Sequence, residues 1–159
     1  MKRCELVGWL KAIIIAAFAM GAVLCFGIAP NIGKELASAY PEVSYLFWPC
    51  LAFIWVTAVP FAGALAESWK ICNAIQKGKA FCSQNAVRLK RISFLAFSEC
   101  VLYFAALAFL AVKDFLHPAI FLLIIVILCI GFAIAIFSAV LSHLTVKAEK
   151  LQDENDLTI

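Results

Sequence analysis

Four long apolar segments constrain this chain more than any other feature of its sequence. They cover residues 12–29, 43–66, 92–112 and 119–146, and Glu99 is the one formally charged residue inside them, although the chain has 13 basic and 10 acidic residues. About 20 apolar residues are enough for a helix to cross roughly 30 Å of hydrocarbon. Transmembrane β-strands would instead alternate in polarity over segments of about 10 residues. The sequence therefore predicts an all-α, polytopic membrane protein with four transmembrane helices.

Composition excludes several other classes of protein. Hydrophobic residues make up 65% of the chain and charged residues 14%, against roughly 25% charged residues in an ordinary soluble domain. A soluble globular domain, a disordered tail and a nucleic-acid-binding module with a basic face are all excluded. We expect a single domain, residues 1–159, in which four helices form a bundle. Its predicted spans are residues 8–29, 43–66, 92–112 and 119–146.

Lysine and arginine predict the orientation in the membrane. If the N-terminus is cytosolic, only Lys34 and Lys113 lie outside, in the outer connections 30–42 and 113–118. Basic residues gather on the cytosolic side of membrane proteins. Both termini, the inner loop 67–91 and the acidic tail 147–159 are therefore predicted to be cytosolic. The basic residues on that side are Lys2, Arg3, Lys11, Lys70, Lys77, Lys79, Arg88, Lys90, Arg91, Lys147 and Lys150.

The basic inner loop 67–91 has two interpretations. Its charges hold the loop inside and meet anionic lipid headgroups, each worth about 1 kcal/mol near the surface. Alternatively, the loop is a docking surface for an acidic cytosolic partner. No recognised DNA- or RNA-binding motif accompanies the charge, so we expect no direct contact with nucleic acid.

Glu99 is the most informative polar residue of the apolar segments. A charge at this depth costs several kcal/mol unless it is paired, hydrated or protonated. Tyr103, one helical turn further on, and His143, near the cytosolic end of the fourth segment, are the expected partners. We predict a neutral carboxyl or one paired with His143, in a structural role. An ion or proton pathway is the functional alternative, but the apolar segments supply no second acidic group for it.

Two features bear on helix shape and packing. Pro60 removes a hydrogen bond to the carbonyl of Val56 and is expected to kink the second helix. Gly131, Ala135 and Ala139 recur every four residues, and small residues at that spacing let helices approach closely. The pattern predicts a packing face, either within one chain or in a homo-oligomer.

The sequence favours neither a catalytic site nor a cofactor. It lacks the phosphate-loop, zinc-protease and serine-hydrolase motifs. Its seven cysteines include no C-x-x-C pair, and we interpret them as small packing residues. A metal site formed by Cys72, Cys82 and His143 is the minor alternative. We therefore expect a protein that is not an enzyme.

Three runs of residues carry a resemblance to a known family. The second segment contains the run Val56-Thr57-Ala58-Val59-Pro60-Phe61. The inner loop contains Gly78-Lys79-Ala80-Phe81, followed by Asn85 and Leu89-Lys90. The chain ends in Glu154-Asn155-Asp156-Leu157-Thr158-Ile159. Together these runs resemble the YoaS-like family of uncharacterised bacterial membrane proteins, filed as a domain of unknown function.

The sequence also departs from that family's pattern at two positions. Cys82 stands where a serine or threonine helix cap is expected, at a cost of about 1 kcal/mol unless Ser83 replaces it. Glu99 is not part of the pattern. The resemblance nevertheless implies a four-helix protein of the bacterial cytoplasmic (inner) membrane.

The resemblance further implies a partner, because such genes are often found beside a small Cro/CI-type helix-turn-helix regulator. The leading hypothesis is a membrane protein that restrains such a regulator or senses on its behalf. A small oligomeric transporter or channel subunit that associates through Gly131, Ala135 and Ala139 is the alternative. Partner binding is assigned to the tail and the inner loop, through Glu154, Asn155, Asp156, Leu157, Thr158, Ile159, Lys79, Phe81, Arg88 and Lys90.

Overall fold

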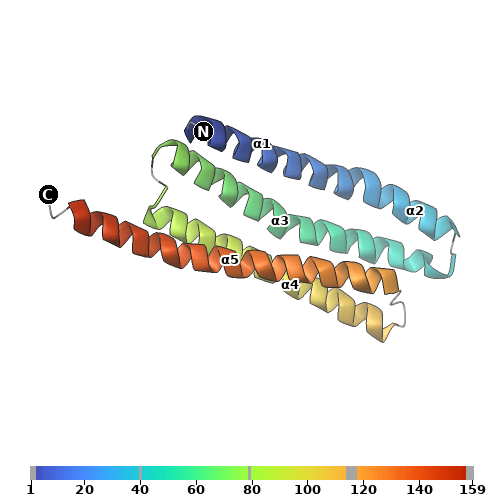
Figure 1. The fold of residues 1–159 in the computed structure, drawn as a ribbon. Helices are drawn as coiled ribbons and strands as arrows, with labels where there is room; N and C mark the ends of the chain where they lie inside the picture. Colours follow the sequence, from blue (N-terminus) through green and yellow to red (C-terminus); the bar gives the residue numbers. More distant parts are fainter. Residues whose placement is uncertain (1–2, 40, 79, 114–117, 157–159) are drawn as a thin grey trace.

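The computed structural model describes residues 3–39, 41–78, 80–113 and 118–156, and all of its regular structure there is helical. Within these residues the chain forms five α-helices and two short irregular ones, and Figure 1 labels the α-helices. In chain order they are α1 (Arg3–Ala22), the π-helix η1 (Val23–Ile28), α2 (Ala29–Ala39), the 3-10 helix η2 (Pro41–Leu46), α3 (Phe47–Gln76), α4 (Ser83–Val112) and α5 (Pro118–Asp156).

Four continuous helical stretches are long and apolar enough to cross a membrane. They are Glu5–Ala39, Ser44–Gln76, Ser83–Val112 and Ile120–Gln152. Each contains one of the four apolar segments or nearly all of it, so the predicted all-α fold with four spanning helices is confirmed.

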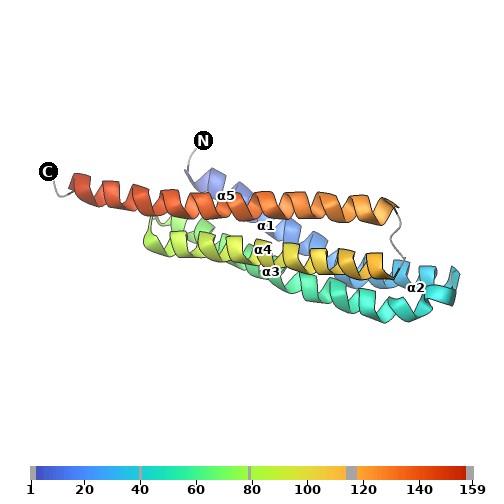
Figure 2. The same ribbon diagram turned by 90° about the horizontal axis from the view of Figure 1, so that it is seen from below.

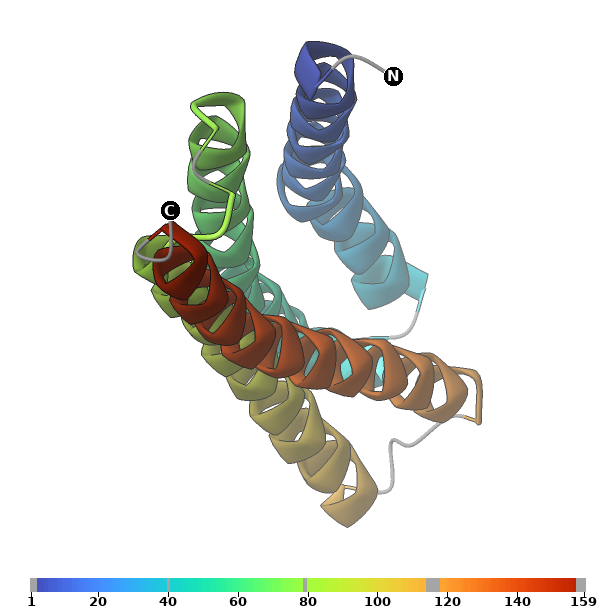
Figure 3. The same ribbon diagram turned by 60° about the vertical axis from the view of Figure 1, so that its left-hand side comes forward.

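The four stretches form an open row rather than the closed bundle that the sequence suggested. Helix α1 packs on α3, α3 on α4, and α4 on α5. Among the described residues α1 does not contact α4 or α5, and Figures 1 and 3 show α3 between α1 and the pair formed by α4 and α5. The N-terminus, the C-terminus and the connection between α3 and α4 all lie at the same end of the row (Figure 1).

The segment 30–42, expected as an outer loop, is mostly helical. Proline lacks an N–H group, and its ring clashes with the carbonyl four residues earlier in a regular α-helix. The wider π-helical turn of η1 lies directly before Pro30 and accommodates it. The side-chain amide of Asn31 donates to the Gly27 carbonyl at 2.8 Å, which satisfies one of the nearby acceptors. Helix α1 therefore continues into α2 instead of ending at the proline.

Helices α4 and α5 meet along a seam of residues that recur alternately every three and four positions. Three contacts mark the seam. The Ser142 hydroxyl donates to the Ala86 carbonyl at 2.7 Å and the Ser93 hydroxyl to the Ala135 carbonyl at 2.7 Å, while the Cys100 thiol lies 3.9 Å from the Leu128 carbonyl. A spacing of 3.5 residues is that of a coiled coil. On α5 the seam comprises Ile124, Leu128, Gly131, Ala135, Ser138, Ser142 and Thr145.

The predicted small-residue face is only partly correct. Ala135 is buried in the seam, and a Cβ atom added to Gly131 would lie 2.6 Å from the Cys100 sulfur. Ala139 is exposed, and the buried residue that follows Ala135 in the seam is Ser138. Gly131 and Ala135 thus serve contact within the chain, and the pattern continues at heptad spacing rather than every four residues.

Candidate functional site

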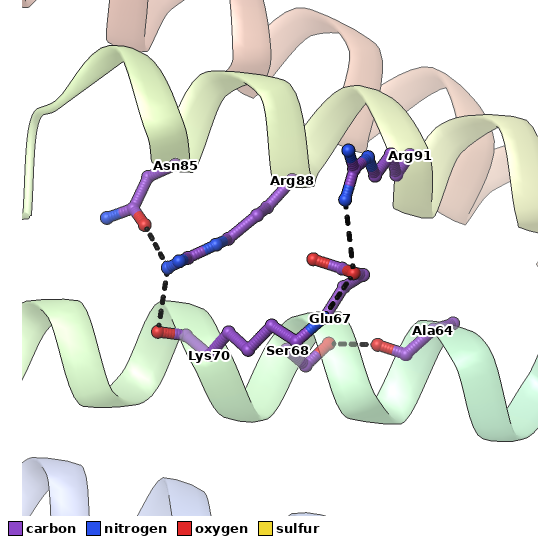
Figure 4. A network of polar contacts seen from close by, with 7 residues as sticks. All are labelled: Ala64, Glu67, Ser68, Lys70, Asn85, Arg88 and Arg91. Atoms are coloured by element: carbon purple, nitrogen blue, oxygen red, sulfur yellow. Dashed lines mark hydrogen bonds and ion pairs between the residues drawn. The ribbon is translucent and has the colours of Figure 1, made fainter.

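Two regions gather polar side chains in this apolar molecule. One is a polar clamp between α3 and α4, formed by Glu67, Lys70, Asn85, Arg88 and Arg91 at the end of the row where the termini lie (Figure 4). The other is a cavity between α1, α3 and α4, within the apolar segments. We describe them in turn.

Glu67 is the centre of the polar clamp. It directly follows the second apolar segment, yet only 8% of the residue is exposed, because α3 continues past that segment and presents Glu67 to α4. Its Oε1 atom lies 2.8 Å from Lys70 Nζ on the next turn and 3.6 Å from Arg91 Nη1 on α4. The carboxylate therefore joins the two helices by an ion pair, a role that the sequence did not indicate.

Arg88 strengthens the same junction. Its Nη1 atom donates to the Lys70 carbonyl at 3.0 Å and to Asn85 Oδ1 at 3.2 Å. Asn85 is 1% exposed and donates through Nδ2 to the Ala80 carbonyl at 2.9 Å. The guanidinium group can bridge several acceptors because its donors are fixed in one plane. Arg88, predicted as a partner-binding residue, is thus held in a contact between α3 and α4.

The first turn of α4 receives its cap from α5. Cys82 is the N-cap residue and its side chain makes no capping hydrogen bond. The Ser83 backbone N–H instead donates to Glu149 Oε1 at 2.9 Å. A carboxylate is favourable at a helix N-terminus, where unpaired N–H groups and the helix dipole both attract negative charge. Glu149 therefore provides the helix cap that we expected the Ser83 side chain to provide.

The remaining predicted partner-binding residues lie around this end of the row. Phe81 is 60% exposed, and Lys90 and Glu154 are exposed as well. Asn155 and Asp156 belong to the last turn of α5. Lys79, Leu157, Thr158 and Ile159 lie outside the described residues.

The cavity has a volume of about 430 Å³ and contains Glu99 in its wall. The Oε2 atom of Glu99 is buried and has no hydrogen-bond partner in the part of the chain that the structure describes. Thr57 donates to the Ile54 carbonyl at 3.0 Å, and both Thr57 and Tyr103 line the cavity. The lining residues are Phe18, Gly21, Ala22, Leu24, Cys25, Phe26, Ile54, Thr57, Ala58, Phe61, Ala62, Glu99 and Tyr103.

The expected pair between Glu99 and His143 is wrong. The seam contacts join Ser93 to Ala135 and Cys100 to Leu128. The two helices are therefore antiparallel, and moving forward along α4 by a given number of residues corresponds to moving back along α5 by the same number. This register places His143 about 14 residues, or roughly 20 Å, along the helix axis from the level of Glu99. His143 is also exposed. Tyr103, the other expected partner, does share the cavity with Glu99.

The minor alternative of a metal site finds no support. Within residues 3–39, 41–78, 80–113 and 118–156, no three side chains of histidine, cysteine, aspartate or glutamate are placed to hold a metal ion. Cys72, Cys82 and His143 are therefore not brought together. Cys72 is buried, as expected of a packing residue.

Comparisons with known proteins place the chain in a family. The model of the family described as "protein of unknown function (DUF2975)" matches residues 31–159. The uncharacterized membrane protein YoaS of Bacillus subtilis (strain 168) is 31% identical over 138 residues, which cover 86% of each chain. No solved structure matches. The chain therefore belongs to the DUF2975 family of YoaS-like membrane proteins.

Proposed function

We propose that this membrane protein binds a cytosolic protein at the end of the row that carries the polar clamp. The observation that carries the proposal is the length of α5, which continues to Asp156 although the fourth apolar segment ends at residue 146. Ten further residues extend a helix by roughly 15 Å. Figure 2 shows α5 reaching beyond the connection between α3 and α4, so its last turns are accessible to another protein.

The side chains at this end suit protein binding. Leu151 on α5 is 63% exposed and Phe81, near the start of α4, is 60% exposed. Exposed Lys90 and Glu154 provide charges of both signs around them. Exposed apolar side chains surrounded by polar ones mark interaction surfaces, and the surrounding charges speed and orient the encounter. Such a surface favours a binding role over an enzymatic one.

The partner that we propose is a small helix-turn-helix regulator of the Cro/CI type, as the family resemblance suggests. The acidic residues that follow Val146 would attract a basic protein before apolar contacts form. DNA would then be contacted by the regulator and not by this chain. Membrane binding of the regulator would remove it from its operator.

The proposal requires the termini to be cytosolic, in a bacterial inner membrane. Reporter fusions at Ala37 and Ile159 test this directly, because the two positions should give signals from opposite compartments. Signals from the same compartment would overturn the topology and, with it, the site proposed for the partner.

Deletion of Asp153–Ile159 tests the partner-binding surface. The shortened protein should keep its four spanning helices, since Ile120–Gln152 already contains the last one. In a pull-down from detergent it should lose the regulator, whereas Lys34→Gln on α2, at the opposite end of the row, should retain it. Retention of the regulator at full strength by the shortened protein would assign binding to Phe81 and Lys90 instead.

The alternative of an oligomeric transporter or channel subunit loses its original support. It depended on Gly131, Ala135 and Ala139 as a face for association between chains. Gly131 and Ala135 pack on α4 of the same chain. We therefore do not propose it further.

A further inference from the structure

We infer that the cavity between α1, α3 and α4 is a binding site for an organic ammonium compound with an apolar body, which enters from the bilayer. The inference concerns a different region from the partner-binding surface and does not depend on it. It rests on the unpartnered carboxyl oxygen in the cavity, on the side chains around it and on the π-helical backbone of one of its walls.

The carboxyl of Glu99 supplies the recognition of an ammonium group. Its buried Oε2 atom has no hydrogen-bond partner in the described residues. An unsatisfied buried polar atom is costly, and an N–H donor that carries positive charge relieves that cost better than a neutral donor does. Among the described residues that line the cavity, none is a lysine, arginine or histidine that would compete for the carboxyl.

Two hydroxyl groups extend this polar corner. Thr57 gives its hydroxyl hydrogen to the Ile54 carbonyl, and Tyr103 lines the same cavity. The Tyr103 oxygen keeps an acceptor site for a second N–H group of the ligand. A primary or secondary ammonium therefore fits this corner better than a quaternary one, which has no N–H group to donate.

The rest of the cavity suits an apolar body. Phe18, Phe26 and Phe61 line it, together with small residues that leave space between the helices. Aromatic rings attract cations as well as apolar groups. A volume of about 430 Å³ falls within the range of roughly 300–1,000 Å³ typical of small-molecule sites.

The backbone departs from a regular α-helix on one side of the cavity and contains a proline on the other. The π-helix η1 contributes Leu24, Cys25 and Phe26 to one wall, and π-turns are frequent at functional sites. On α3, Pro60 lies between the lining residues Ala58 and Phe61. Helix α1 and its continuation contact only the η2–α3 side of the row in the described residues, so the cavity is reached from the bilayer beside α1.

Fluorescence titration of the detergent-solubilised full chain tests the inference. Dansylcadaverine, a primary ammonium with an apolar body, serves as the probe, and its N-acetylated form is the matched neutral compound. We expect saturable binding of the ammonium probe and at least roughly tenfold weaker binding of the neutral form, which lacks the charge-assisted contact. Equal affinities of the unmodified chain for both probes would overturn the inference.

Variants then locate the site. Glu99→Gln keeps the shape of the side chain and should weaken binding of the ammonium probe at least roughly tenfold. Glu5→Gln, an exposed glutamate on α1 outside the cavity, should leave the affinity unchanged. A folded Glu99→Gln protein that binds the probe as the original chain does would refute the site. If Glu99→Gln does not fold, Ala58→Phe decides, because it fills the cavity without altering the carboxyl and should abolish binding.

Discussion

The two sides of the row show opposite solutions to packing helices in a membrane. On one side, α4 and α5 are in close contact along a seam of small and hydroxyl-bearing residues. On the other side, α1 and α3 enclose part of a cavity lined by phenylalanines. Lipid tails solvate apolar side chains as well as another helix does, so close approach in a membrane depends on small residues and on interhelical hydrogen bonds. The seam has both, and the α1 side has few of either.

One pair of glycines shows the difference at a single atom. A Cβ atom added to Gly131 in the seam would lie 2.6 Å from the Cys100 sulfur, close to the backbone of α4. At Gly21 on α1 it would lie 3.1 Å from a ring atom at the side of Phe61, which can turn into the cavity. A larger side chain therefore has no room in the seam, whereas the α1 side has a cavity beside it that can accommodate one.

The first prediction uses that contrast and has the largest expected effect. Gly131→Leu should lower the free energy of unfolding by about 1–3 kcal/mol, because overpacking forces the two helices apart. Gly21→Leu should cost less. Gly8→Leu is the control, since nothing lies within 4 Å of a Cβ atom there. Unfolding in SDS titrations measures all three, and an equal loss for Gly21→Leu and Gly131→Leu would contradict the comparison.

The second prediction concerns the cap that α5 gives to α4. Glu149→Ala removes the acceptor of the Ser83 N–H and should cost about 1 kcal/mol, as the loss of a helix cap does. Glu149→Gln keeps an acceptor oxygen and should cost clearly less. Hydrogen exchange at Ser83 and its neighbours should quicken in the alanine variant, and unchanged exchange there would show that the contact is dispensable.

The third prediction tests the interhelical hydrogen bonds of the seam. Ser93→Ala removes the bond to the Ala135 carbonyl and should cost about 0.6 kcal/mol, the average for such bonds in a membrane protein. Ser98→Ala is a matched control, because the Ser98 hydroxyl bonds to Leu95 within its own helix. Equal losses for both serine variants would show that the loss does not come from the seam.

The fourth prediction, with the smallest effect, probes the attachment of α1. Lys11 donates to Gln76 Oε1 at 2.9 Å and lies 5.3 Å from the ring centre of Trp69. The hydrogen bond is exposed, so Lys11→Met should cost less than about 0.5 kcal/mol. Lys90→Met serves as the control for removal of an exposed lysine at the same end. A loss larger than that of Ser93→Ala would mean that α1 is held as firmly as α5.

The sequence was sufficient for the four spanning helices and insufficient for their ends. Apolar length alone predicts a membrane span, and each of the four segments lies in a helix that is long and apolar enough for one. The segment 30–42 was expected as an outer loop between two apolar segments, and it contains Pro30 and Gly33, which are poor helix formers. The π-turn before Pro30 and the contact of Gly33 with Phe47 make a helix possible there. Neither compensation can be recognised from single-residue preferences.

In the candidate sites, too, the sequence was sufficient for features within one helix and insufficient for contacts between helices. Glu99 and Tyr103 were singled out and do share a cavity, because they lie one turn apart on the same helix. The pairing with His143 failed because it required the axial register between two helices, which the contacts of Ser93 with Ala135 and of Cys100 with Leu128 reveal. The face of α5 that meets α4 follows a three-four alternation and not a spacing of four residues. That alternation was present in the sequence from Ile124 to Thr145. Burial of Glu67 could not be foreseen, because it depends on Arg91 arriving from α4.

The cap on α4 has a consequence for how the chain is made. The first turn of α4 is completed by Glu149, a residue 66 positions further along the chain than Ser83. Chains are synthesised from the N-terminus at about 5–20 residues per second, so for several seconds α4 exists without its cap. During that interval the start of α4 is held by α3, through Arg88 and Arg91. The first turn of α4 acquires its cap only after α5, which carries Glu149, has been synthesised.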